Sequence, residues 1–129
     1  MNQAGQWGLV ALGGALGAMA RHGVNLWIAL ASRTNFPYAT LSVNAAGSLV
    51  AGIFFVLYTQ AYPGNAGLRL FGAVGFLGAF TTFSAFSVDT MLLLGAGNWR
   101  DACVNIVLNL TLSLVLCWFG IAVARATFI

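Results

Sequence analysis

Amide and hydroxyl side chains recur at four-residue intervals inside apolar stretches of the sequence. Asn105, Asn109 and Ser113 fall on three successive turns of one stretch, and Asn44 and Ser48 lie one turn apart in another. Residues four apart share a helix face, so each set forms a stripe of hydrogen-bond donors. If these stretches span a membrane, the stripes indicate an ion path or hydrogen bonds that join helices. Both interpretations stay open.

A single cation lies deep in the first apolar stretch. Gly13, Gly17, Arg21 and Asn25 recur every four residues and therefore share one face. The glycine pair is a small-xxx-small motif, which predicts close packing on another helix. Arg21 on the same face either draws anions into a vestibule or has a structural role, donating hydrogen bonds to backbone carbonyls.

A third stretch contains residues that weaken a helix in mid-span. "GFLGAFTTFSAFS", residues 75–87, holds Gly75, Gly78 and the β-branched pair Thr81 and Thr82. Non-helical backbone at membrane depth is tolerated only where it is buried in protein or lines water. An unwound turn there would turn carbonyls away from the helix and free them to coordinate a cation.

The same stretch carries Phe80, Phe83 and Phe86 at three-residue spacing. Their positive ring edges could face an anion, or the rings could simply pack on lipid and neighbouring helices. The chain has no Glu, and Asp89 lies toward the end of this stretch. The abundance of donors, a deep Arg and the lack of a central carboxylate favour an anion over a proton-coupled cation.

Composition defines the elements that must position these residues. The chain has 129 residues, of which 60% are hydrophobic and 5% charged; soluble domains are about 25% charged, so a membrane protein is predicted. The high pI reflects few acids rather than a basic patch, so nucleic-acid binding has no support. Since a span needs about 20 apolar residues, we expect one all-α domain, a bundle of four membrane helices. The expected spans are 7–31, 38–61, 68–94 and 102–126.

The charges that flank these spans are balanced. Arg69 and Arg125 fall on the side of the N-terminus, and Arg33 and Arg100 fall on the other side. Orientation normally follows an excess of Lys and Arg on the cytoplasmic side. The balance predicts insertion in both orientations, which would allow an antiparallel homodimer; a single orientation fixed by other features is the alternative.

Four motifs together resemble the Fluc (CrcB) family of fluoride channels. "GFLGAFTTFSAFSVD" is similar to the family signature G-F-C-G-G-F-T-T-F-S-T-F-S-x-E. "GGALGAMAR", "TLSVNAAGS" and "NIVLNLTLS" also resemble the family, in order and at the expected spacing. The resemblance covers nearly the whole chain.

The resemblance implies a channel rather than an enzyme. Toxic cytoplasmic fluoride would leave a bacterial cell passively across the inner membrane. The channel would be a dual-topology antiparallel homodimer in the lipid bilayer, with two pores and a central structural Na⁺. Six residues are expected to line the fluoride pore. Phe83, Phe86, Asn44 and Ser84 match family pore residues, and Asn105 and Asn109 are added from the donor stripe. Gly78 and Thr81 match positions whose backbone carbonyls hold Na⁺, and Arg21 matches the first-span Arg.

The sequence also departs from the family pattern. Ala79 replaces a Gly, Ala85 stands where Thr is usual, and Asp89 replaces a Glu. The resemblance implies a track of hydroxyls along the pore, which includes Ser84, and the missing hydroxyl at Ala85 puts the completeness of this track in doubt. Two alternatives remain: a small multidrug exporter, which needs a Glu in its first span, and a non-transporting assembly subunit, which would not need polar stripes.

Overall fold

The computed structural model describes residues 2–129, and nearly all of them are helical. The elements are α1 (Gln3–Ala31), α2 (Tyr38–Val56), η1 (Leu57–Ala61), α3 (Ala66–Leu68), η2 (Arg69–Leu77), α4 (Gly78–Phe80), α5 (Phe83–Gly95) and α6 (Trp99–Phe128). η1 and η2 are π-helical and continue α2 and α3 without a break. The predicted spans 7–31, 38–61 and 102–126 lie within these helical segments, and the span 68–94 is helical except at residues 81 and 82.

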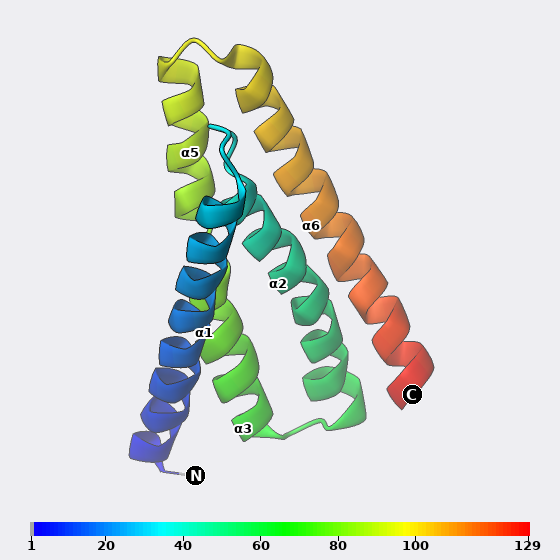
Figure 1. The fold of residues 1–129 in the computed structure, drawn as a ribbon. Coiled ribbons are helices and arrows are strands. Elements are labelled where there is room, and N and C mark those ends of the chain that lie inside the picture. Colours follow the sequence, from blue (N-terminus) through cyan, green and yellow to red (C-terminus); the bar gives the residue numbers. More distant parts are fainter. Residues whose placement is uncertain (1) are drawn as a thin grey trace.

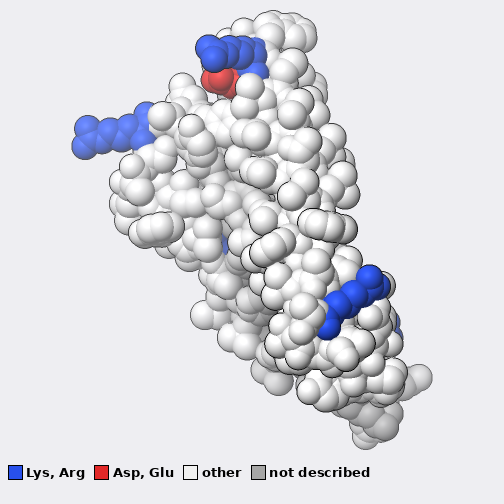
Figure 2. Space-filling view, turned by 90° about the vertical axis from the view of Figure 1, so that its right-hand side faces the viewer, with Lys and Arg blue, Asp and Glu red and all other residues white. Residues whose placement is uncertain are grey.

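The exposed surface is that of a membrane protein. Within the described residues, three helical segments are long and apolar enough to cross a bilayer: Tyr38–Ala61, Ala66–Gly95 and Trp99–Phe128. Large apolar side chains point outward along α6, where Leu114 is 71% and Trp118 is 68% exposed. Figure 2 shows a face that is uncharged over most of its area, with a few charged side chains toward its ends. Such an apolar surface suits contact with lipid or another subunit.

The elements form a bundle in which the third segment is divided. In Figure 1 both termini lie toward one end of the molecule, and the turn between α5 and α6 lies at the other. α1 packs mainly against η2 and α4, whereas α2 packs along α6. α5 packs against α6 and has little contact with α2. The division of the third segment therefore separates a half that packs on α1 from a half that packs on α6.

The predicted small-residue motif in α1 is a packing surface. Gly13 and Gly17 are buried. A Cβ on Gly13 would collide with the main chain at Phe71, and one on Gly17 would collide with the main chain at Phe76. Gly75 of η2 faces α1 in the same way, against the Val10 carbonyl. The two backbones touch, as expected for small residues at a membrane-helix contact.

The predicted interruption of the third segment is present at two residues. Thr81 has φ −80° and ψ 157°, and Thr82 has φ −155° and ψ 118°, so both are extended. α5 then begins at Phe83, and the Thr82 hydroxyl caps it by accepting a hydrogen bond from the Ala85 N–H at 3.2 Å. Gly75 and Gly78, which the sequence also suggested as breakers, lie in helical turns.

Candidate ion-binding site

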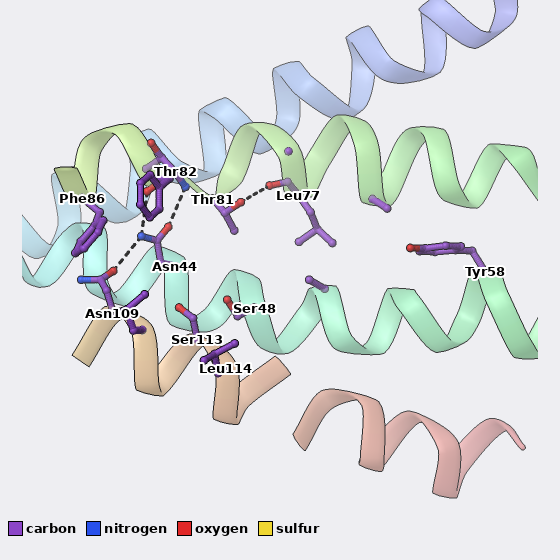
Figure 3. A pocket seen from close by; sticks show the side chains of 15 residues that line it. Asn44, Ser48, Tyr58, Leu77, Thr81, Thr82, Phe86, Asn109, Ser113 and Leu114 are labelled. Carbon is purple, nitrogen blue, oxygen red and sulfur yellow. Dashed lines mark hydrogen bonds between the residues drawn. The ribbon is translucent and has the colours of Figure 1, made fainter. Parts of the chain in front are cut away.

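A cavity of about 540 Å³ lies beside the break, between α2, α6 and the divided third segment. Figure 3 shows the polar side chains along it and places Tyr58 farther from the break. Its polar lining consists of Asn44, Ser48, Tyr58, Thr81, Thr82, Asn109 and Ser113. Apolar groups, including Phe83, Phe86 and Leu114, complete the wall.

Asn44 of α2 binds the main chain at the break. Its Oδ1 accepts a hydrogen bond from the Thr82 N–H at 2.9 Å, and its Nδ2 donates to the Thr82 carbonyl at 3.0 Å. The same Nδ2 donates to Oδ1 of Asn109 at 3.0 Å. Asn44 thus supplies the acceptor that the Thr82 N–H loses because Thr82 is extended, and it adds a donor to the Thr82 carbonyl.

The hydrogen bonds continue from Asn44 into the core of the bundle. Asn109 donates from Nδ2 to Oδ1 of Asn105 at 2.8 Å and to its carbonyl at 3.1 Å. Asn105 donates to the Thr90 hydroxyl at 3.0 Å, and that hydroxyl donates to the Phe86 carbonyl at 2.8 Å. Asn105 is 0% exposed and Asn109 is 5% exposed. We refer to Asn44, Asn109, Asn105 and Thr90 as the amide chain.

A second cavity of about 560 Å³ lies on the other side of the break. Arg21, His22, Asn25, Thr40, Thr82, Ser84 and Asp89 line it, so Thr82 contributes to both cavities. Thr40 donates a hydrogen bond to Asp89 at 2.6 Å, and the hydroxyls of Ser84 and Thr82 are 3.2 Å apart. The start of α5, where a helix dipole favours negative charge, faces the same space as Arg21.

The two phenylalanines after the break differ in exposure. Phe83 is 73% exposed and Phe86 only 8%. Their ring centroids are 5.2 Å apart with an interplanar angle of 59°, so they form a tilted pair. Phe80 belongs to another pair, stacked on Phe76 with centroids 5.8 Å apart. The break therefore separates Phe80 from the two rings that line the first cavity.

The carbonyls of Gly78 and Thr81, which lie before and within the break, have lost their helical partners. In a continuous helix the Gly78 carbonyl would accept from the Thr82 N–H, which here donates to Asn44. Similarly, the Ala85 N–H donates to the Thr82 hydroxyl rather than to the Thr81 carbonyl. Within residues 2–129 no hydrogen bond reaches either carbonyl oxygen. Both oxygens are therefore free to coordinate a cation, and these residues fit the Na⁺ ligation that the resemblance implies.

The structure brings most of the residues predicted from sequence to the break, but it places them differently. Asn44, Phe83, Phe86, Asn109, Gly78 and Thr81 line the first cavity, and Arg21 and Ser84 line the second. Asn105 lines neither of these cavities and lies inside the bundle. Its proposed contact with fluoride stays a prediction, as do those of the other residues.

Sequence reasoning missed Thr40 and Thr90, and it named Thr82 only as a residue that weakens the helix. Thr82 is bound by Asn44 and caps α5, Thr40 binds Asp89, and Thr90 ends the amide chain. Thr82 carried a usable signal, because a Thr that follows breakers and precedes a helical run is a typical N-cap. Nothing local marks Thr90, whose partner Asn105 lies on the next helix.

Apolar helices, a backbone break within the third of them and cavities with polar groups beside that break define a multi-pass membrane protein of the channel and transporter class. Comparison with known families specifies this class further. The chain belongs to the family described as "CrcB-like protein, Camphor Resistance (CrcB)", whose model matches residues 8–121.

Curated relatives match over most of their length. The chain is 40% identical over 116 residues to a "Fluoride-specific ion channel FluC" of Legionella pneumophila (strain Paris), which covers 90% of this chain and 87% of the relative. It is 43% identical over 111 residues to "Fluoride-specific ion channel FluC 2" of Symbiobacterium thermophilum, covering 86% and 90%. A relative of the same name from Aliivibrio salmonicida is 40% identical over 126 residues, covering 98% and 100%. These relatives are named as ion channels, not enzymes.

Proposed function

We propose that this protein is a fluoride channel that lets cytoplasmic fluoride leave the cell passively across the bacterial inner membrane. The observation that carries the proposal is the pair of donor-lined cavities that meet at the Thr82 break. Relatives of 40% identity over nearly the full chain are named as fluoride-specific channels. Ion binding in a channel must be favourable enough for entry and weak enough for release.

The chemistry of the cavities suits a small, strongly hydrated anion. Hydroxyls such as those of Ser48 and Ser113, together with the edge of Phe83, can replace water around fluoride without adding a positive charge that would trap it. Arg21 and the start of α5 lie in the second cavity, where they would attract an anion from solution. The second cavity would then be a vestibule, and the first a segment of the pore.

We propose that four helices cross the membrane and that two subunits assemble as an antiparallel, dual-topology homodimer. α1 has 29 residues, about 44 Å at 1.5 Å per residue, which is enough to span a bilayer. Both termini lie toward one end, as an even number of crossings requires (Figure 1). Labelling a single Cys at one terminus of a Cys-free variant should mark both sides of the membrane; one-sided labelling would exclude dual topology.

The dimer would contain two pores, with the exposed Phe83 ring available to the partner subunit. A structural Na⁺ would lie between the subunits, held by the Gly78 and Thr81 carbonyls of each. A Cβ on Gly78 would meet only the Ala73 carbonyl, at 3.9 Å, so this side of the break is open to a close neighbour. The cation would offset the cost of placing anions in a low-dielectric core.

The test is fluoride efflux from liposomes that contain only the purified protein, with chloride efflux as control. The parent should release fluoride much faster than protein-free liposomes do, and it should release chloride far more slowly than fluoride.

Phe83→Ile and Phe86→Ile should each lower fluoride flux strongly, because Ile keeps an apolar bulk but has no positive ring edge. Phe119→Ile, at a ring 50% exposed on α6, should conduct like the parent.

Absence of fluoride efflux from the parent would refute the channel proposal. Full fluoride flux in both Phe83→Ile and Phe86→Ile would leave the channel but remove the rings from the ion path. Since Phe86 is buried, its variant needs a check that the protein still elutes as the parent oligomer.

A further inference from the structure

The hydrogen bonds of Asn44 determine the direction of a peptide group. The Thr82 N–H, which donates to Asn44, belongs to the same planar peptide unit as the Thr81 carbonyl. In a trans peptide the N–H and C=O point in opposite directions. No cis peptide occurs in residues 2–129. Asn44 therefore fixes the Thr81 carbonyl so that its oxygen points away from the Asn44 amide.

We propose that Asn44 is a positioning residue for the Thr81 carbonyl, and that the amide chain keeps Asn44 in place. The sodium part of this inference rests on the proposed function, which assigns the Thr81 carbonyl to Na⁺. Asn44 uses both Nδ2 hydrogens, one on the Thr82 carbonyl and one on Asn109. It cannot donate to an ion from this side chain conformation without releasing one of these partners.

The orientation of each amide in the chain follows from its partners. The Thr82 N–H can only donate and the Thr82 carbonyl can only accept, so the oxygen and nitrogen of Asn44 are fixed. Asn109 must then present its oxygen to Asn44 and its nitrogen to the Asn105 carbonyl, which also only accepts. Turning any one amide over would place two donors or two acceptors together.

α2 holds Thr81 and Thr82 by close packing as well as by hydrogen bonds. Gly47, one turn after Asn44, faces the methyl group of Thr81, and a Cβ there would collide with that methyl. The Thr81 hydroxyl and N–H both bond back to the Leu77 carbonyl, at 2.9 and 3.0 Å. Thr81 is thus held by its own helix on one side and by α2 on the other, and only its carbonyl is free.

The peptide unit can be observed alone, because residues 81–82 are the one place in the sequence where two threonines are adjacent. Threonine labelled with ¹³C at the carbonyl and ¹⁵N at the amide gives a single carbonyl-to-amide NMR correlation from the Thr81–Thr82 unit. Its ¹³C shift reports the Thr81 carbonyl, and the exchange of its N–H reports the bond to Asn44. Na⁺ is then titrated at constant ionic strength against N-methyl-D-glucamine.

Three variants separate the proposal from a general structural effect. Asn44→Leu removes both bonds to Thr82, so the Thr82 N–H should exchange on the order of tenfold faster. The apparent Na⁺ affinity should fall on the order of tenfold as well, since the carbonyl loses its fixed direction. Asn109→Leu leaves the Thr82 bonds but frees one side of Asn44, and should weaken Na⁺ by about threefold. Thr111→Val is the control, because that hydroxyl bonds only to Val107 of its own helix.

The inference is overturned if Asn44→Leu and Asn109→Leu keep the parent correlation, N–H exchange and Na⁺ affinity. A Thr111→Val effect as large as that of Asn109→Leu would overturn it too. If Asn44→Leu does not assemble, the N–H exchange and Na⁺ affinity of Asn109→Leu alone decide whether the inference holds. If the parent protein binds Na⁺ at this carbonyl but moves no fluoride, the channel proposal is refuted and the inference stands. If Na⁺ does not change the Thr81–Thr82 correlation of the parent, the sodium part of the inference and of the proposed function is overturned.

Discussion

The contact between α2 and α6 is made differently at its two ends. At one end, Gly52 lies against the Cys117 carbonyl and Gly120 against the Leu49 carbonyl, so the two backbones touch. At the other end, Asn44 and Asn109 meet through a hydrogen bond of 3.0 Å. The same pair of helices therefore uses close packing in one half and paired amides in the other.

The difference shows how each half constrains the fold. A glycine contact fixes how near the helices come but makes no demand on which atoms lie opposite, because dispersion is not directional. The amide contact demands particular donors and acceptors and links α2 to the Thr82 break. We therefore expect the glycine end to contribute most to the stability of the bundle, and the amide end to hold the break. Substitutions at the two ends should separate these roles.

The largest effect is expected at the glycine end. Gly52→Leu places a side chain against main-chain atoms of Cys117 and Ile121 that cannot move aside. Overpacking typically costs about 1–3 kcal/mol and more where backbone must shift, so we expect at least about 3 kcal/mol here. The measurement is the yield of folded protein after detergent extraction, together with its thermal midpoint.

Gly8→Leu is the matched control, because a Cβ at Gly8 has no neighbour within 4 Å. It should behave like the parent. Equal yields for the two variants would mean that α2 and α6 do not depend on backbone contact, and the distinction between the two ends would be lost.

An intermediate effect is expected within the amide chain. Asn105→Leu removes the acceptor of the Asn109 amide and the donor to Thr90, in a fully buried position. Leaving a buried polar group unpaired costs about 1–3 kcal/mol. Thr90→Val should also destabilise, since Asn105 then lacks its acceptor. Unfolding in mixed micelles gives the free energies.

The double variant makes this prediction specific. With Asn105→Leu and Thr90→Val together, neither residue leaves the other unpaired, so the combined loss should be smaller than the sum by about 1 kcal/mol. Strict additivity would show that the two side chains do not act on each other and that the amide chain does not reach Thr90.

The sequence predicted the break but not what holds it. Breakers near Thr81 and Thr82 are local features, and the chain is extended there. The π-helical turns of η2, by contrast, pack Phe71 and Phe76 main-chain atoms against Gly13 and Gly17 of another helix. Such turns depend on packing between segments, which helix propensity does not contain.

The site shows the same limit. The four-residue spacing of Asn105 and Asn109 correctly placed them on one face, since Asn109 bonds directly to Asn105. The spacing did not identify Asn44 and Thr90, on other helices, as their partners. A polar stripe gives the direction in which its side chains point, whereas its role depends on which groups the fold brings opposite.

The smallest effect is expected at Ser113, the third member of that stripe. Its side chain faces the first cavity (Figure 3), and its hydroxyl takes part in none of the hydrogen bonds found within residues 2–129. Ser113→Ala therefore leaves no partner unpaired, and stability should change by no more than about 0.5 kcal/mol. A loss as large as that of Asn105→Leu would contradict this contrast, because it would require a partner for the hydroxyl that the amide chain does not supply. Fluoride flux measured on the same sample sharpens the result: reduced flux at unchanged stability would place the hydroxyl on the ion path. Residues at equal spacing on one helix would then have opposite roles, with Asn105 supporting the break and Ser113 contacting the ion.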